Sequence, residues 1–270
     1  MGDKVGGESL ESRLMSLRKS PRALLLFDYD GTLVPIVSHP AWARPDEDLL
    51  SFLGQLAARP SYTVGIISGR RVRELAEFFA GLNLYLVGLH GGEAITPEGK
   101  YVSYLDDQRV VNLALRGLAS KTRELLRMLR QPPGFFLEDK GIALALHYRG
   151  ASPAEVARVV PQFLAWAGDF LEKWDLEILR GKKMVEVRPR GMNKGQAVTR
   201  LVAAWPGRLH PGTMILYAGD DITDEDAFQA LSQHREAVTI YIGEAQRPTA
   251  ACYRLPSPSS LRELIRRCLL

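Results

Sequence analysis

Short apolar segments alternate with amphipathic segments in the first part of the chain, and this alternation limits the possible folds more than any other feature. Residues 24–27, 62–67 and 84–87 are predicted to be buried strands, and residues 45–56 and 71–79 the helices between them. Strands that alternate with helices form parallel sheets with helical crossovers. The sequence therefore predicts an α/β protein with a doubly wound, Rossmann-like parallel-sheet core.

The pattern changes near residue 101 and returns near residue 188. Between these points we predict helices at 113–129 and 153–171 and strands at 135–137, 141–148, 174–179 and 184–187. The core pattern then continues with a helix after Asn193, strands at 213–217 and 237–242 and a helix from Ser259. We therefore expect a core of residues 1–100 and 188–270 and an inserted α+β cap domain of residues 101–187. Such a cap above the carboxyl ends of the strands could act as a lid that excludes water and recognises the substrate.

Composition excludes several classes of protein. The 270 residues are 46% apolar and 24% charged, as in ordinary globular proteins. The net charge of +4 comes without a dense run of Lys and Arg, so we expect no nucleic-acid partner and favour a small anionic substrate. The apolar run 23–27 is too short for a signal peptide or a membrane span. The two cysteines, Cys252 and Cys268, lie far from the acidic motifs, so we expect a cytoplasmic protein without disulfides or thiolate metal sites.

Three predicted strand ends carry polar residues. These are Asp28 and Asp30, Ser68 and Arg70, and His90 and Glu93. In parallel sheets ligands gather at the carboxyl ends of the strands. Asp28 and Asp30 are two residues apart and would repel each other unless a cation lay between them, and an aspartate held against Mg²⁺ can attack phosphorus. The alternative is a strand that ends in an acidic turn, because Asp-Gly is a common turn pair.

A second acidic cluster, residues 219–226, follows a later predicted strand. Five acids lie within its last seven residues, and Mg²⁺ prefers carboxylates together with water and phosphate oxygens. Alternatively, Thr223 caps a helix whose first turn favours the acids that follow. That cap would not explain Asp220, which comes directly after the strand.

Lys194 and Ser68 could supply contacts to a phosphate. Lys194 stands at a predicted helix N-terminus, where the helix dipole favours anions, so a purely structural lysine is not expected there. Ser68 lies between a strand and a helix, where its hydroxyl and nearby N–H groups suit phosphate oxygens. A serine in that place is more often a helix cap, and that alternative stays open.

The ordered combination resembles the haloacid dehalogenase superfamily of phosphotransferases. Its four motifs occur here as residues 28–32, Ser68, Lys194 and residues 219–221. Within that superfamily the chain resembles the trehalose-6-phosphate phosphatase family over nearly its full length. The motifs that carry this resemblance are Ser68-Gly69-Arg70, His90-Gly91 with Glu93, Glu186-Val187-Arg188-Pro189 before Asn193-Lys194-Gly195, and residues 219–225.

The resemblance implies roles for individual residues. Asp28 would be the nucleophile and Asp30 the acid and base, while Ser68 and Lys194 would offset phosphoryl charge. Mg²⁺ would be bound by Asp28, the backbone carbonyl of Asp30 and Asp220, with Asp224 and Asp221 orienting the ligands. The implied substrate-binding residues are Arg70, His90, Glu138, Lys140, Arg149, Lys182, Glu186 and Asn193. Without the resemblance, Glu138, Lys140 and Arg149 would be taken for solvated surface charges, and His147 could be exposed or locally hydrogen-bonded.

The expected function is the Mg²⁺-dependent hydrolysis of trehalose 6-phosphate to trehalose and phosphate. Alternatives are a phosphatase of sucrose phosphate or glycosyl-phosphoglycerate, a non-catalytic sugar-phosphate-binding partner of a synthase, and a phosphomutase. We expect these 270 residues to hold no synthase domain, so that a separate trehalose-6-phosphate synthase chain is a possible partner.

Overall fold

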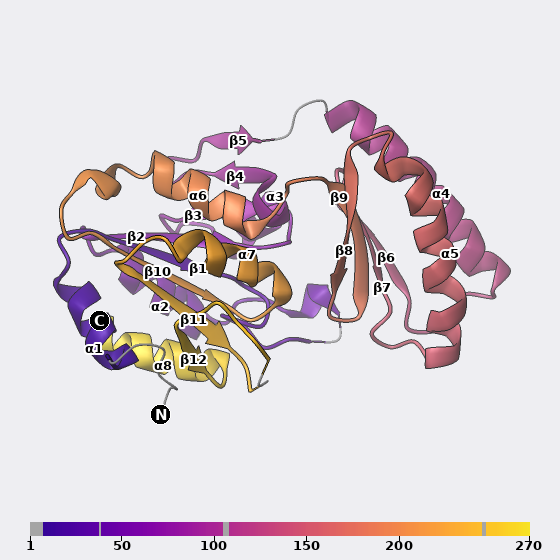
Figure 1. Cartoon of the computed structure of the whole chain (residues 1–270). Coiled ribbons are helices and arrows are strands. Elements are labelled where there is room, and N and C mark those ends of the chain that lie inside the picture. The colour runs from indigo at the N-terminus through magenta and orange to yellow at the C-terminus, as the bar shows by residue number, and fades with distance from the viewer. Residues whose placement is uncertain (1–7, 38, 105–107, 245–246) are drawn as a thin grey trace. The chain divides into compact units, whose positions relative to one another are not determined.

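The computed structural model describes residues 8–37, 39–104, 108–244 and 247–270. The chain divides into two compact units (Figure 1), the first containing the residues up to Tyr104 together with Asn193–Leu270, and the second the residues between them. The boundaries lie at residues 104 and 192, a few residues beyond the expected 100 and 187. The second unit ends later than expected because strand β9 (Met184–Pro189) pairs with β8 (Leu176–Gly181) along its whole length.

The first unit is built on an eight-stranded sheet with the order β12-β11-β10-β1-β2-β3-β4-β5. Its parallel strands are β1 (Ala23–Phe27), β2 (Tyr62–Ile67), β3 (Tyr85–Gly88), β10 (Met214–Gly219), β11 (Ala237–Ile242) and β12 (Tyr253–Leu255). The mainly parallel sheet confirms the predicted fold class. Antiparallel β4 (Glu93–Ile95) and β5 (Tyr101–Ser103) extend one edge and were not predicted, because three residues are too few to show a periodic pattern.

Strand β1 is apolar throughout because both faces of the sheet are covered. Leu25 and Phe27 belong to one apolar cluster, and Leu24 and Leu26 to the other. The first cluster includes residues of α1 (Leu10–Lys19), α2 (Glu47–Ala57), α3 (Val72–Phe78) and α8 (Pro258–Leu269). The second includes residues of α6 (Lys194–Ala204) and α7 (Ile222–Leu231). The described part of this unit also has short 3₁₀ turns at Pro40–Trp42, Leu89–Gly91 and Pro206–Leu209.

The second unit is an antiparallel sheet covered by two helices on the same face (Figure 1). Its strand order is β6-β7-β9-β8, with β6 at Phe136–Asp139 and β7 at Leu144–His147, and its helices are α4 (Gln108–Met128) and α5 (Pro153–Leu171). Leu144, Leu146 and Val185 pack with the helices. Side chains alternate along a strand, so the residues between these positions lie on the opposite face of the sheet.

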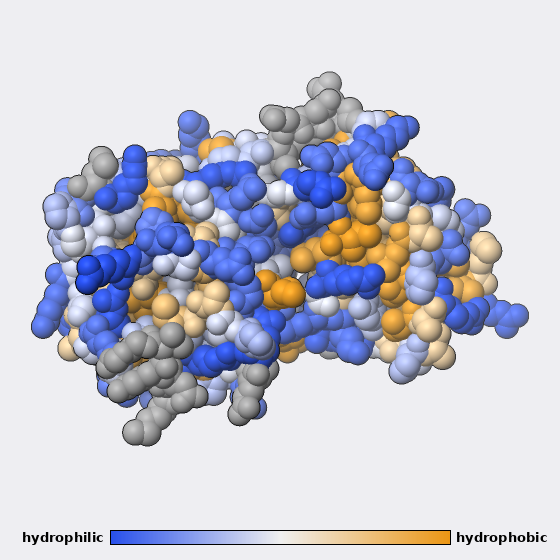
Figure 2. Space-filling model, viewed as in Figure 1, coloured by the Kyte–Doolittle hydropathy of each residue, from blue (hydrophilic) through white to orange (hydrophobic). Residues whose placement is uncertain are grey.

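Hydrophilic side chains cover much of the visible face of the first unit, with smaller apolar areas between them (Figure 2). Across the residues with a described position, every helix is too short or too polar to span a bilayer.

Candidate active site

Adjacent parallel strands bring the two acidic motifs together. Phe27 at the end of β1 is paired with Ala218 of β10, and the Asp28 N–H donates to the Ala218 carbonyl at 2.9 Å. Asp28 and Asp220 therefore follow neighbouring strand ends. Together with Asp224 they form a buried group in which one carboxylate oxygen of each residue lies within 4.8 Å of the other two. We call Asp28, Asp220 and Asp224 the acidic triad.

Glycines in both motifs allow this close approach. Gly31 has a φ of +96°, and a Cβ there would overlap the Asp220 carboxylate. A Cβ on Gly219 would likewise overlap Asp224. The hydroxyl of Thr32 donates to Asp28 Oδ2 at 3.0 Å. The Asp-Gly-Thr and Gly-Asp sequences are therefore needed for the shape of the site as well as its charge.

Lys194 provides a positive charge inside the triad. It is the first residue of α6, and its buried Nζ donates to Asp28 Oδ1 at 2.6 Å and to Asp224 Oδ1 at 2.8 Å. Burial by itself would lower the pKa of Lys194, but Asp224 and Asp28 outweigh it and raise the pKa above its ordinary value. The lysine is therefore a fixed ammonium group, and the two carboxylates explain its place at a helix N-terminus.

The surroundings of Asp28 disfavour its ionised form. Burial raises the pKa of its carboxyl well above the usual range, Asp224 and Asp220 raise it further, and Lys194 opposes the shift. A divalent cation among these oxygens would favour the ionised form, and hard cations such as Mg²⁺ take oxygen ligands of this kind. The buried triad is therefore consistent with a metal site.

Asp224 is already bonded through both carboxylate oxygens. Oδ1 accepts from Lys194 and, at 2.6 Å, from the Tyr217 hydroxyl, while Oδ2 accepts from the backbone N–H groups of Asp220 and Asp221 at 3.1 and 2.9 Å. Burial, together with the nearby negative charges of Asp224 and Asp28, raises the pKa of Tyr217 and keeps its hydroxyl a donor. These contacts make Asp224 the support of Lys194 and of the turn after β10. The cap of α7 is Asp221 and not Thr223, the alternative that the sequence left open, since the helix starts at Ile222.

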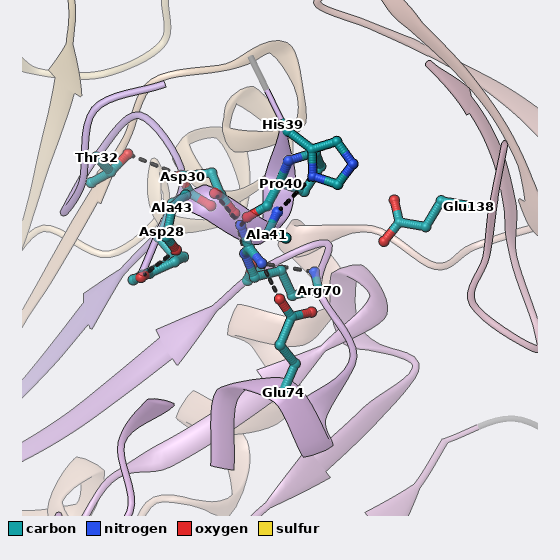
Figure 3. Close-up of polar contacts among 12 residues, drawn as sticks. Asp28, Asp30, Thr32, His39, Pro40, Ala41, Ala43, Arg70, Glu74 and Glu138 are labelled. Carbon is teal, nitrogen blue, oxygen red and sulfur yellow. Dashed lines mark hydrogen bonds and ion pairs between the residues drawn. The ribbon is translucent and has the colours of Figure 1, made fainter. Parts of the chain in front are cut away.

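Asp30 is held apart from the triad by Arg70. Its two carboxylate oxygens accept from Arg70 Nε and Nη2, both at 2.8 Å (Figure 3). The Asp30 side chain remains 39% exposed, whereas that of Arg70 is 6% exposed. The acid therefore faces solvent while its partner is buried.

The loop after β2 is held together by residues that were predicted to bind ligand. The buried Ser68 hydroxyl accepts from the Arg70 N–H at 3.2 Å, and the Ser68 carbonyl accepts from the His90 N–H at 2.9 Å. Glu93 Oε1 accepts from the N–H of Val72, the first residue of α3, at 2.7 Å. Glu93 thus caps α3 from β4, a role that the sequence did not reveal because β4 itself was not predicted.

Asn193 also has a structural contact. It is the N-cap of α6, and its Oδ1 accepts from the Gln196 N–H at 2.8 Å. This cap fixes the helix end that carries Lys194. The contact supports the position of the lysine whether or not Asn193 also binds substrate.

The sugar-binding candidates of the second unit centre on a buried ion pair. Lys140 Nζ contacts Glu186 Oε2 at 2.7 Å and Glu138 Oε2 at 3.9 Å, and Glu138 also contacts His147 Nε2 at 2.8 Å. Glu138 and Glu186 both pair in register with Ala145, which puts them on the sheet face away from α4 and α5. We call Glu138, Lys140, His147 and Glu186 the second-unit cluster. His147, left open by the sequence, is one of its members.

Two further candidates lie outside the cluster contacts. Arg149 and Lys182 are both exposed, and Arg149 Nη2 donates to the Lys182 carbonyl at 3.1 Å. This bond ties the loop after β7 to the turn between β8 and β9.

The fold defines the class of protein as a mainly parallel α/β protein with an inserted α+β unit and an acidic site at adjacent strand ends. A structure described as a haloacid dehalogenase-like hydrolase from Bacteroides thetaiotaomicron shares this fold, with a TM-score of 0.61 over 91% of this chain and 99% of that one, at 15% identity. The family model for trehalose-phosphatases matches residues 26–259. The chain therefore belongs to the trehalose-phosphatase family, which confirms the resemblance drawn from the motifs.

Individual relatives agree with this assignment. The bifunctional trehalose-6-phosphate synthase/phosphatase of Thermoproteus tenax is 36% identical over 95% of this chain and 33% of its own length. The trehalose-phosphate phosphatase of Mycobacterium marinum is 31% identical over 90% of this chain and 60% of its own. The C-terminal domain of C. albicans trehalose-6-phosphate phosphatase matches over 99% of both chains, with a TM-score of 0.78 and 29% identity. The chain spans about a third of the length of the first curated relatives that it matches.

Proposed function

We propose that this chain hydrolyses trehalose 6-phosphate to trehalose and phosphate with the help of Mg²⁺. The observation that carries the proposal is the burial of Asp28 beside a fixed ammonium group and two further carboxylates. This site can hold a nucleophile, a phosphoryl group and a divalent cation together, which is what phosphoryl transfer requires. The names of the relatives supply the substrate.

In the first step an Asp28 carboxylate oxygen attacks phosphorus. The bond between phosphorus and the sugar oxygen breaks, and Asp30 donates its proton to that oxygen, so that trehalose leaves as a neutral alcohol. Lys194 and the Ser68 hydroxyl stabilise the phosphoryl oxygens in the transition state. Asp30 begins this step with both oxygens bonded to Arg70, so the sugar oxygen must approach its exposed side.

In the second step a water molecule attacks the phosphorus of the aspartyl phosphate. Asp30, now ionised, takes a proton from the water, and the bond between phosphorus and Asp28 breaks to release phosphate. The same carboxyl therefore acts first as acid and then as base. Lys194 keeps its contact with Asp28 through both steps because Asp224 holds it from the other side.

Mg²⁺ is the proposed metal. Asp28, Asp220 and the Asp30 backbone carbonyl would bind it, and Asp224 and Asp221 would orient those ligands. When bound, the ion neutralises charge on the phosphate and favours the ionised form of Asp28. Asp224 would bind the ion directly only if the metal replaced one of its present hydrogen bonds.

The second-unit cluster is proposed to recognise the sugar. Paired acids and bases can accept from and donate to hydroxyl groups, which are the only polar groups of the disaccharide besides its phosphate and ether oxygens. Arg149, Lys182, His90 and Asn193 are proposed as further substrate contacts. Arg70 was expected to be another, but its guanidinium already donates to Asp30, to Glu74 and to the Pro40 carbonyl.

A panel of phosphorylated sugars tests the proposal. Purified protein with Mg²⁺ should release phosphate from trehalose 6-phosphate with a higher kcat/KM than from sucrose phosphate, glucose 6-phosphate or glycosyl-phosphoglycerate. A preference for another sugar phosphate would retain the chemistry and overturn the substrate. No turnover of any of them would favour a non-catalytic binding partner of a synthase, and return of phosphate to a second position on the sugar would indicate a mutase.

The Thermoproteus tenax relative is named as a bifunctional synthase/phosphatase, and this name supports a synthase as a partner of the present chain. We propose an encounter with a trehalose-6-phosphate synthase that supplies the substrate. The free thiols of Cys252 and Cys268 are compatible with the expected cytoplasmic location.

A further inference from the structure

Asp30, the proposed acid and base, is bound by an arginine that is itself fixed by several contacts. Arg70 donates to both carboxylate oxygens of Asp30, to the carbonyl of Pro40 at 2.7 Å through Nη2, and to the Glu74 carboxylate through Nη1 (Figure 3). A guanidinium group has five N–H donors, and four of them are used in these bonds. Their directions fix both the plane and the position of the guanidinium.

Two aromatic rings also lie against the same guanidinium. The Arg70 Cζ lies 5.3 Å from the ring centroid of Tyr29 and 5.3 Å from that of Phe78. The Tyr29 hydroxyl donates to the Ala43 carbonyl at 2.8 Å, which fixes this ring. Tyr29 stands between the two aspartates in the sequence, so the residue between nucleophile and acid provides a wall for the arginine that binds the acid.

We propose that Arg70 is a positioning residue that holds Asp30 in the orientation needed for proton transfer, and that Glu74 fixes Arg70 in turn. The inference rests on the proposed function, in which Asp30 is the acid and base. It replaces the expected sugar contact of Arg70, because a buried guanidinium with four donors engaged has little left for a hydroxyl. A bidentate fork sets the plane of a carboxylate, which a single point charge does not do.

The proposal predicts a dependence on the leaving group. A sugar alkoxide is a poor leaving group and needs the proton of Asp30, whereas nitrophenolate leaves from p-nitrophenyl phosphate without one. If Asp30 is misplaced, formation of the aspartyl phosphate slows for the sugar substrate and continues for the aryl substrate. Hydrolysis of the intermediate slows for both, because it needs Asp30 as base.

The test compares Arg70→Lys and Glu74→Ala with the wild-type chain in Mg²⁺. Because misplaced catalytic groups cost about 100-fold, kcat/KM for trehalose 6-phosphate should fall about 100-fold in Arg70→Lys, and by less in Glu74→Ala. For p-nitrophenyl phosphate, kcat/KM should change less than about fivefold, since general acid catalysis contributes little there. A burst of nitrophenol of about one equivalent per site should precede slow turnover.

Two controls separate positioning from folding. Glu77→Ala removes an exposed carboxylate from the same helix and should behave as wild type with both substrates. Thermal unfolding shows whether the variants fold, and Glu74→Ala is the safer of the two because the Glu74 side chain is 33% exposed.

Equal losses of kcat/KM on both substrates would overturn the proposal in favour of a structural role. A higher KM for the sugar phosphate with unchanged kcat would also overturn it, since Arg70 would then bind the sugar directly. If the wild-type chain prefers a different sugar phosphate, the same comparison is made with that compound, so an error in the substrate is distinguished from an error about Arg70. A wild-type chain inactive on both compounds would refute the proposed function and this inference together.

Discussion

Two charged groups of the molecule, the acidic triad with Lys194 and the second-unit cluster, differ in their balance of charge. The first has three carboxylates around one ammonium group. The second pairs Glu186 with Lys140 at 2.7 Å and Glu138 with His147 at 2.8 Å. The first lies at the carboxyl ends of parallel strands and the second on a sheet face, so both are held by sheets and the contrast is one of charge.

This contrast shows what each group is suited to bind. An excess of buried negative charge is unfavourable: burial raises the pKa of Asp28, Lys194 opposes the shift, and Asp224 and Asp220 add to it, so a further cation would stabilise the group. A buried pair of opposite charges compensates itself, and its remaining lone pairs and protons suit neutral hydroxyl groups. The predictions below test whether the first group performs chemistry and the second recognises the substrate.

The largest effect is expected from Asp28→Asn. The amide cannot attack phosphorus, so kcat should fall by about 10⁴-fold or more with either a sugar phosphate or an aryl phosphate. Phosphate release in a fixed-time assay measures this loss, and circular dichroism checks the fold. Wild-type rates in the variant would refute the nucleophile and remove the proposed difference between the two groups.

A smaller and selective effect is expected from changes in the second-unit cluster. Glu186→Gln removes a charge beside Lys140, so the KM for trehalose 6-phosphate should rise about tenfold, while kinetics with p-nitrophenyl phosphate should change less than about twofold. Lys140→Ala should act in the same direction, with a stability loss of about 3 kcal/mol, because it leaves the buried Glu186 charge uncompensated.

Glu172→Gln is the matched control for the second unit, since Glu172 is an exposed acid at the end of α5. It should leave both substrates unaffected. Equal changes with the sugar and aryl substrates in Glu186→Gln would mean that the cluster supports the fold and does not recognise sugar.

The smallest effect concerns stability and pH. The pKa of Asp28 is raised in the folded state, so between its unfolded and folded values the folded chain holds the extra proton. Without metal, this group makes stability fall as pH rises through that window, by up to about 1.4 kcal/mol per pH unit. Below the unfolded pKa the Asp28 carboxyl is protonated in both states, so this loss of stability disappears. The difference between wild-type and Asp28→Asn unfolding curves across pH, measured in a chelator, isolates the effect.

Added Mg²⁺ should reverse this trend. A ligand at about 100 times its Kd stabilises the folded state by about 2.7 kcal/mol, and protonation of Asp28 competes with the metal. The rise in Tm should therefore grow with pH and be much smaller in Asp28→Asn. A rise of the same size in both proteins would place the metal elsewhere.

The motifs predicted the parts of the site that depend on one strand and the residues that follow it. The family resemblance implied that Asp28 and Asp220 share one metal ion, and the parallel pairing of β1 and β10 brings the two residues together. The Glu93 cap of α3 could not be predicted, since it needs the three-residue strand β4 at the sheet edge. The Asp30–Arg70 pair was also missed, because its two members come from loops 40 residues apart and a local pattern does not show that they meet.

The sequence by itself determined the kinds of element, their order and the acids at the strand ends, because apolar periodicity and turn residues act over a few neighbours. Only the tertiary structure decided which charged side chains contact one another. Lys194 lies 166 residues from Asp28, and whether Asp224 holds that lysine or a metal depends on side chains brought together from β10, α6 and α7. Distances of a few ångströms control these electrostatic energies, and such distances exist only once the helices and strands have packed.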